Sequence, residues 1–258
     1  MKSNKILPRF GEERRAVILK MLRRNGRIEV LDLARLMKVS EHTVRRDLLD
    51  LQSQGHLHKT HGGAVAIDTA RLDFPARAGV LAGAKNAIGR AAAALIEPGQ
   101  TVILDAGSTS MSMARALSVR PLTLITNSLD IAALFDRDAG VQLVVTGGAW
   151  QPQARALWGP GTRDMLANCR ADWAVPGACA IDLRMGVTAA HEADAATKRA
   201  MIGSAARTLV LADHSKMGNV SPFAVARWQD VDTLVMDRPW PELKALGVNV
   251  RVAPATDP

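Results

Sequence analysis

Residues 40–51 read SEHTVRRDLLDL. Val44 and Leu48 recur at helical spacing, which predicts a helix over about 41–54 with one apolar face. Ser40 stands where an N-cap residue belongs, and the doubled arginine lies away from the apolar face. A helix of this kind packs on its own domain and presents cations to a partner.

Two shorter helices are predicted upstream, at about 12–25 and 30–37, from the same apolar periodicity. The predicted order is typical of a helix-turn-helix: two helices, a tight turn, and a third helix that begins with polar residues. The second helix of such a pair enters the major groove of DNA, where arginine can bind guanine with two hydrogen bonds. A small helical bundle for protein interaction is the alternative.

The segment 57–66 predicts a β-hairpin with basic residues around Gly62-Gly63, a wing that would lie against the DNA backbone or the minor groove. Three histidines lie nearby, but without a neighbouring cysteine or carboxylate we expect no metal. The expected DNA-contacting residues are Ser40, His42, Thr43, Arg45, Arg46, Lys59 and His61.

The distribution of charge supports this expectation. Residues 1–68 hold 14 Lys and Arg against 8 Asp and Glu, whereas residues 69–258 hold 19 against 17. A basic segment on a near-neutral body indicates an anionic polymer as partner, double-stranded DNA first, although a solvated lysine-rich face would show the same excess. Only nine Phe and Trp and no Tyr occur, which disfavours single-strand binding by base stacking.

The composition is that of a soluble globular protein, with 48% apolar and 22% charged residues. No apolar run approaches the ~20 residues of a membrane span, and the first nine residues lack the apolar core of a secretory signal. Two cysteines exclude a disulfide framework. We therefore expect a cytoplasmic protein that needs no membrane and associates with the bacterial nucleoid when it binds DNA.

The periodicity lapses over 68–84, which predicts a linker between a DNA-binding domain at 10–67 and a second domain at 85–255. In the second domain, apolar strand-like runs alternate with helical stretches. The expected strands are 101–106, 122–126, 141–146, 173–175, 208–212 and 233–236. The expected helices are 85–96, 110–117, 129–135, 162–169, 193–206 and 239–246. This α/β alternation predicts a doubly wound, mainly parallel sheet.

Small polar residues follow five of these strands, and ligands bind at the carboxyl ends of strands in such sheets. Hydroxyls, amides, glycines and two lysines there suit a small, hydroxylated, anionic ligand. The same residue types are also common in ordinary turns. The expected effector-binding residues are Asp105, Gly107, Ser108, Thr109, Ser110, Thr126, Asn127, Ser128, Gly147, Gly148, Gly177, Asp194, Lys198, Asp213 and Lys216.

Two of these residues allow more than one interpretation. Asp194 and Lys198 are four apart on a predicted helix, so they could form an ordinary surface ion pair. In a ligand site, Lys198 would hold a phosphate, and Asp194 would bind a sugar hydroxyl or orient the lysine. Neither a G-x-G-x-x-G fingerprint nor a P-loop occurs, so no nucleotide or other cofactor is expected. Cys179 has no evident base and is expected to be a small buried apolar residue.

Several motifs resemble those of the DeoR family of bacterial transcription regulators. They are Ser40-Glu41-His42-Thr43-Val44-Arg45-Arg46-Asp47-Leu48, His61-Gly62-Gly63-Ala64, Leu104-Asp105-Ala106-Gly107-Ser108-Thr109, Thr126-Asn127-Ser128, Lys198-Arg199-Ala200-Met201 and Asp213-His214-Ser215-Lys216. The resemblance covers about 12–237 and implies a winged helix-turn-helix joined to a sensor domain similar in fold to sugar-phosphate isomerases. Members of this family usually bind a phosphorylated sugar or a related metabolite, which alters operator binding.

These observations predict a repressor that acts as a homo-oligomer, a dimer or a tetramer, because paired helix-turn-helix units bind half-sites of an operator. Effector and operator would weaken each other's binding through linkage. A sugar-phosphate isomerase with an added helical domain, or an adaptor that binds only proteins, are the alternatives. An isomerase would have no use for the basic wing. An adaptor would explain neither the basic wing nor the polar residues at the strand ends.

Overall fold

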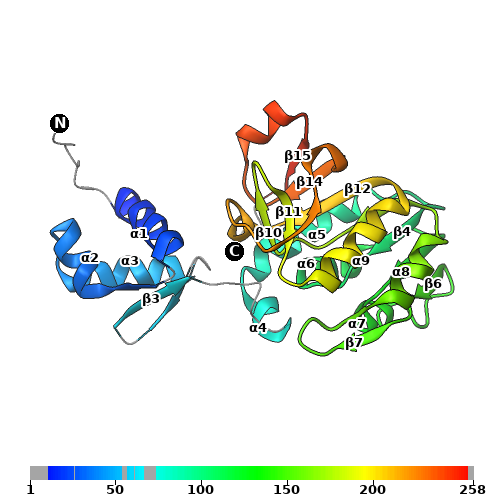
Figure 1. The fold of residues 1–258 in the computed structure, drawn as a ribbon, viewed down its shortest axis with the longest axis horizontal. Coiled ribbons are helices and arrows are strands. Elements are labelled where there is room, and N and C mark those ends of the chain that lie inside the picture. The colour runs from blue at the N-terminus through cyan, green and yellow to red at the C-terminus, as the bar shows by residue number, and fades with distance from the viewer. Residues whose placement is uncertain (1–10, 26, 54–56, 61, 67–73, 255–258) are drawn as a thin grey trace. The chain divides into compact units, whose positions relative to one another are not determined.

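The computed structural model describes residues 11–25, 27–53, 57–60, 62–66 and 74–254. The chain separates into two compact units, Met1–Asp68 and Thr69–Pro258. Figure 1 labels their elements, and each unit is described on its own. No helix among the described residues is long and apolar enough to cross a membrane.

The first unit contains three helices and a small antiparallel sheet. The helices are α1 (Gly11–Asn25), α2 (Val30–Met37) and α3 (Glu41–Ser53), and the strands are β1 (Arg27–Glu29), β2 (Leu57–Lys59) and β3 (Gly63–Ala66). The sheet has the order β1-β3-β2, so the predicted hairpin is confirmed and gains a third strand. Strand β1 was not predicted, because three residues are too few for an alternating pattern to be recognised.

One apolar core holds this unit together. Ile18 of α1, Leu33 of α2 and the stripe Val44, Leu48 of α3 are all buried in one cluster, together with Leu57 of the hairpin. The residues that predicted the three helices are therefore those that pack them against one another. Since the apolar face of α3 is used inward, its polar face remains at the surface of the unit.

The second unit is built on a seven-stranded sheet in the order β15-β14-β12-β9-β4-β5-β6, with every neighbouring pair parallel. Its strands are β4 (Thr101–Leu104), β5 (Leu122–Thr126), β6 (Val141–Val145), β9 (Ala171–Val175), β12 (Ala205–Ala212), β14 (Thr233–Met236) and β15 (Asn249–Val252). The predicted parallel α/β sheet is confirmed, and β15 is an additional strand at its edge.

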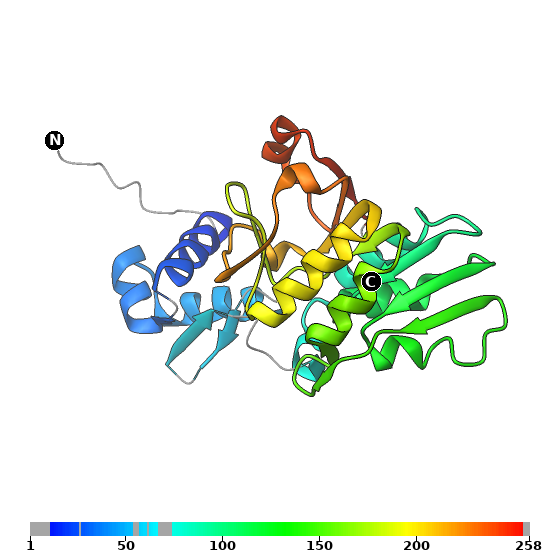
Figure 2. The same cartoon turned by 45° about the vertical axis from the view of Figure 1, so that its right-hand side comes forward.

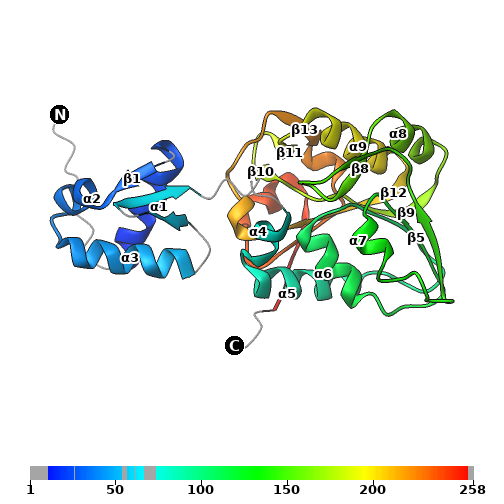
Figure 3. The ribbon, with the colours of Figure 1, turned by 90° about the horizontal axis from the view of Figure 1, so that it is seen from below.

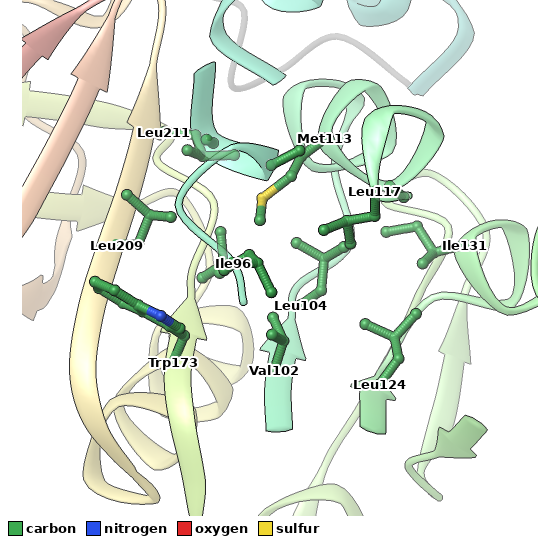
Figure 4. Packing of buried hydrophobic residues seen from close by; sticks show 14 of the residues in the cluster. Ile96, Val102, Leu104, Met113, Leu117, Leu124, Ile131, Trp173, Leu209 and Leu211 are labelled. Atoms are coloured by element: carbon green, nitrogen blue, oxygen red, sulfur yellow. The ribbon is translucent and has the colours of Figure 1, made fainter. Parts of the chain in front are cut away.

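Helices cover both faces of this sheet (Figures 2 and 3). On one face lie α5 (Ala82–Ala93), α6 (Ser108–Ala116) and α7 (Leu129–Ala132), and on the other lie α8 (Pro160–Ala167) and α9 (Glu192–Gly203). Figure 4 shows the first of these cores, where Val102 and Leu104 of β4 meet Met113 and Leu117. The intervening Ile103 packs in the opposite core, as expected for alternating side chains of a strand.

Smaller elements complete the second unit. A three-stranded antiparallel sheet has the order β10-β11-β13, and β7 and β8 form a hairpin. The strands are β7 (Ala149–Gln151), β8 (Ala156–Trp158), β10 (Ala180–Asp182), β11 (Gly186–Ala189) and β13 (Phe223–Ala226). The short 3₁₀ helices are η1 (His214–Lys216), η2 (Trp228–Asp230) and η3 (Pro241–Leu246). The last replaces the helix predicted at 239–246, and none of the five strands was predicted.

The stretch predicted as a linker also contains a helix. α4 (Phe74–Gly79) lies within 68–84, and α5 begins at Ala82 instead of residue 85. Pro75 occupies the second position of α4, where its missing N–H costs no hydrogen bond. Phe74-Pro75 therefore starts a helix within the stretch that was predicted as a linker.

Candidate functional sites

The first turn of α3 has the polar geometry predicted from its sequence. The Ser40 hydroxyl oxygen accepts a hydrogen bond from the backbone N–H of Thr43 at 3.2 Å, and the two side-chain hydroxyls lie 2.9 Å apart. Ser40 therefore caps the helix as expected. Both hydroxyls remain near the surface at the end of α3 that would approach base edges in a helix-turn-helix complex.

The exposed face of α3 carries His42, Arg45 and Arg46. Arg45 forms an ion pair with Glu41, 2.8 Å away and four residues earlier on the helix. No ion pair joins Arg46 to any residue that the structure describes. Arg46 is thus the arginine of this face whose guanidinium can bind a nucleic acid without first breaking an internal pair.

Part of the basic excess of this unit is used internally. Arg14 of α1 donates two hydrogen bonds to the buried carboxylate of Asp47 on α3, at 2.8 and 3.2 Å. The hydrogen bond with Asp47 raises the pKa of Arg14. Arg15 also reaches α3, 3.2 Å from Asp50. These two arginines of α1 form ion pairs with carboxylates of α3. The count of basic residues in this unit therefore overstates the number of cations available to DNA.

The wing is attached to α3 by a hydrogen bond. The backbone N–H of Lys59 donates to the side-chain oxygen of Gln52 at 2.9 Å, and the Lys59 side chain is half-buried. This bond sets the distance between the wing and the helix. The last expected DNA-contacting residue, His61, lies outside the described residues.

The parallel sheet has its topological switch point between β4 and β9. The chain runs outward from β4 through β5 to β6, then returns to the other side of β4 as β9. In doubly wound sheets ligands bind at this point, beyond the carboxyl ends of the two strands. Asp105 directly follows β4, and Gly177 lies two residues beyond the end of β9; the sequence analysis selected both.

Asp105 is the centre of a buried polar network at this point. One oxygen accepts a hydrogen bond from the Asn127 side chain at 3.0 Å, and the other accepts the Gly177 N–H at 2.9 Å. The second oxygen also lies 3.2 Å from Nζ of Lys198. Oδ1 of Asn127 in turn accepts a hydrogen bond from the backbone N–H of Ala106 at 2.8 Å. Three strand ends and α9 therefore meet at one carboxylate.

Lys198 and Asp194 are both buried, so the interpretation of a surface ion pair is wrong. The Lys198 ammonium contacts the Asp194 carboxylate as well as Asp105. Burial alone would lower the pKa of Lys198, but the two carboxylates outweigh it and hold the pKa above its ordinary value. Burial raises the pKa of Asp194, against the effect of Lys198. Cys179 is only partly buried, with Sγ 3.9 Å from Asp194.

A second cluster surrounds the turn after β12. Oδ1 of Asp213 accepts hydrogen bonds from the N–H and the hydroxyl of Ser215, whereas Oδ2 is buried without a hydrogen-bond partner among the described residues. Lys216 is buried beside it. Gly177 pairs with Leu211 of β12, so this turn adjoins the Asp105 network at the same edge of the sheet.

Lys85 of α5 belongs to this second cluster, although the sequence analysis did not select it. Its side chain is buried, and Nζ donates a 2.5 Å hydrogen bond to the carbonyl oxygen of Arg77. Burial lowers the pKa of Lys85 to about 8; Asp213 opposes the shift, while Lys216 and Arg77 add to it. A lysine near the start of a helix gives no sequence signal of burial. The contact with Arg77 of α4 is tertiary, so the sequence pattern does not show it.

The other predicted residues lie around these two clusters. Gly107 (φ 151°) precedes α6, whose first turn contains Ser108, Thr109 and Ser110, and both serines are buried. The Thr126 hydroxyl accepts a hydrogen bond from the backbone N–H of Ser128, and the Ser128 hydroxyl caps the N-terminus of α7. All of these lie at the carboxyl edge of the sheet, beside Asp105 and Asn127.

Gly147 and Gly148 lie farther out, after the edge strand β6. The Gly147 carbonyl accepts the Thr162 hydroxyl. Gly148 has φ 128°, and a Cβ there would lie 2.7 Å from the carbonyl oxygen of Trp158. Close packing against β8 and α8 therefore requires a glycine at position 148. Among the described residues, no group of His, Cys, Asp and Glu is arranged to hold a metal ion.

Two family models match the chain, one for each unit. Residues 14–70 match the DeoR-like helix-turn-helix domain, and residues 82–238 match the DeoR C terminal sensor domain. The chain belongs to the DeoR family. This DeoR-family protein is therefore a DNA-binding regulator of transcription and not an enzyme, and the resemblance seen in the sequence is confirmed. Both polar clusters described above lie within the sensor domain.

Several curated relatives cover most of this regulator. The HTH-type transcriptional repressor GlcR of Bacillus subtilis (strain 168) is 36% identical over 89% of this chain and 89% of its own. The transcriptional repressor AccR of Agrobacterium fabrum is 35% identical over 88% of this chain and 89% of its own. The L-fucose operon activator of Haemophilus influenzae is 33% identical over 88% and 92%.

Among solved structures, ribose 5-phosphate isomerase A from Methanocaldococcus jannaschii resembles part of this chain. It has a TM-score of 0.37 and 18% identity over 52% of this chain and 53% of that chain. A likeness of this size says nothing about a substrate or a ligand.

Proposed function

We propose that this DeoR-family regulator is a repressor whose operator binding is modulated by a phosphorylated sugar or a related metabolite. In this proposal, residues 10–67 bind the operator and residues 85–255 bind the effector. A homo-oligomer, dimer or tetramer, presents paired helix-turn-helix units to the half-sites of the operator. The proposed DNA contacts are Ser40, His42, Thr43, Arg45, Arg46, Lys59 and His61.

The observation that carries the effector site is the gathering of buried ionisable groups at one edge of the sheet. Lys85, Lys216 and Lys198 are all buried there, and a buried oxygen of Asp213 lacks a hydrogen-bond partner among the described residues. A buried carboxylate oxygen without a hydrogen-bond partner is costly, and buried ionisable groups gathered in one place indicate a functional site.

The two clusters suit the two ends of a sugar phosphate. Lys198 is held between the carboxylates of Asp105 and Asp194, so this cluster carries no excess positive charge and suits sugar hydroxyls. The second cluster brings two buried lysines, Lys85 and Lys216, to the same edge of the sheet, and their ammonium groups suit the phosphate. This arrangement favours an orienting role for the Asp194 and Lys198 pair. The remaining proposed effector contacts are Gly107, Ser108, Thr109, Ser110, Thr126, Asn127, Ser128, Gly147, Gly148 and Gly177.

Calorimetry on the full chain tests the effector site. The protein is titrated with a panel of pentose and hexose phosphates and with the same sugars without phosphate, at fixed ionic strength. We expect at least one phosphorylated sugar to bind, its parent sugar to bind at least tenfold more weakly, and Lys216→Ala to reduce the affinity for the phosphorylated form. Equal binding of both forms, or no binding by any member of the panel, contradicts the proposal.

A further inference from the structure

Helix α4 is the first described element of the second unit and lies next to the ligand site. It packs against α6, beside α5 (Figures 1 and 3). The Phe74 N–H donates to the carbonyl oxygen of Gln153 at 3.0 Å, in the turn between β7 and β8. At its other end, the Arg77 carbonyl accepts the buried ammonium of Lys85. α4 is thus held partly by a residue of the proposed phosphate site.

Arg77 adjoins the same site, because its carbonyl oxygen lies 2.5 Å from Nζ of Lys85. The residue is half-buried, and its guanidinium forms no ion pair with any residue that the structure describes. Its charge acts on two residues, lowering the pKa of Asp194 on one side and that of Lys85 on the other. Arg77 therefore lies near both clusters and adds a third cation to the side that holds Lys85 and Lys216.

We propose that Arg77 binds the anionic group of the effector together with Lys85, so that the ligand fixes α4 and thereby acts on the segment that precedes it in the chain, the DNA-binding unit. The proposal rests on the proposed function, since it uses the same anion site. It adds a ligand contact from outside the sheet edge and assigns the coupling to one helix.

The physical argument is a difference in stability. α4 has six residues, so an isolated helix of this length would not persist, and its position depends on a few contacts with its neighbours. Local elements with few contacts open at low cost in free energy. A phosphate group bridging Arg77 and Lys85 adds charge-assisted hydrogen bonds that exist only when α4 is in place. Ligand binding and the packing of α4 against its neighbours then stabilise each other.

Hydrogen exchange of the full chain, measured by mass spectrometry with saturating inorganic phosphate, tests this proposal. A chloride control has matched ionic strength. In the wild type we expect phosphate to slow exchange in α4 at least about fivefold, together with the turn after β12. Arg77→Ala should abolish the protection of α4 and weaken phosphate binding at least fivefold, and Arg77→Lys should retain part of both. Arg90→Ala, an exposed arginine on α5, is the matched control and should behave as the wild type.

The outcomes separate the two proposals. If phosphate protects the turn after β12 but leaves exchange in α4 unchanged, the anion site stands and the role of α4 is wrong. If Arg77→Ala binds phosphate as the wild type does, Arg77 is not a ligand. If phosphate changes exchange nowhere in the second unit, the anion site itself is wrong and this inference is overturned with it.

Discussion

The ammonium of Lys198 lies 3.2 Å from the carboxylate of Asp105, and both side chains are buried at the switch point of the sheet. The pair joins α9 to the end of β4, and Asp194 completes it from the same helix. Because no bulk water screens these charges, the removal of one leaves the others unpaired in a medium of low polarity.

Lys198→Met keeps most of the side-chain volume but leaves two carboxylates buried without their cation. We expect it to lower the free energy of unfolding of the sensor domain by about 3–5 kcal/mol. All five tryptophans lie beyond residue 149, so tryptophan fluorescence in urea reports on this domain. The neighbouring Arg199→Ala, which breaks an exposed pair with Glu192, should cost less than about 1 kcal/mol. Equal effects of the two variants would contradict the account of the buried pair.

The pKa of Lys85, about 8, makes phosphate binding depend on pH. A phosphate ester is mostly a dianion above about pH 6, so its own charge changes little between pH 7 and 9. The ammonium of Lys85 is present below pH 8 and is lost above it. We therefore expect affinity for the phosphorylated sugar found by calorimetry to fall about tenfold from pH 7 to pH 9.

Lys85→Met provides the control for this pH dependence. It should bind the phosphorylated sugar weakly at pH 7 and lose the further fall between pH 7 and pH 9. The measurement is a calorimetric titration at several pH values. A wild-type affinity that is constant over this range would show that Lys85 is not a ligand of the anion.

Arg46 and Arg14 distinguish DNA contact from support of α3. Arg46→Ala should weaken operator binding by about 1–3 kcal/mol, roughly 5- to 150-fold, with the domain still folded. Arg14→Ala should instead speed hydrogen exchange in α3, because it removes both hydrogen bonds from Arg14 to the buried carboxylate of Asp47 and leaves it only the longer 3.8 Å ion pair with Arg15. Anisotropy with operator DNA and exchange mass spectrometry on both variants give the comparison. Faster hydrogen exchange of α3 in Arg46→Ala would contradict a role of Arg46 in DNA contact alone. Wild-type exchange of α3 in Arg14→Ala would contradict the supporting role of Arg14.

Gly89 fixes the close approach of α5 and α6, the helices beside the ligand site. A Cβ at this position would lie 2.5 Å from the carbonyl carbon of Ser112. Gly89→Ala should therefore destabilise the sensor domain by about 1–3 kcal/mol. Gly203→Ala, where a Cβ meets nothing within 4 Å, should leave stability unchanged or raise it. Urea unfolding that gives the same midpoint for both variants would contradict this packing.

The sequence predicted the elements whose side-chain pattern is long enough to show a period. α3 and the strands β4, β5 and β14 belong to this class, because their apolar residues alternate or recur over several positions. α4 was missed because it has six residues and begins with Phe74-Pro75, which is also a common way to end a helix. Its contacts with Lys85 and Gln153 are tertiary and leave no periodic signal.

For the site, the sequence predicted which strand ends carry polar residues, since the carboxyl ends of parallel strands share one edge. It could not show how these residues pair. The ambiguity between a surface pair and a buried cluster at Asp194 and Lys198 depends on what packs over α9. The Arg14 and Asp47 pair joins residues 33 positions apart, and the sequence alone counted Arg14 as a cation for DNA.

The central claim is that the sensor domain and the operator respond to one another. The most direct measurement is fluorescence anisotropy on an operator selected by the full chain from genomic fragments, at physiological salt, with and without the phosphosugar found by calorimetry. The salt concentration is held fixed because a basic domain binds any duplex when ions are scarce. We predict that the phosphosugar weakens operator binding at least fivefold in the wild type and much less in Lys216→Ala. Operator affinity that is the same with and without the phosphosugar would contradict the account.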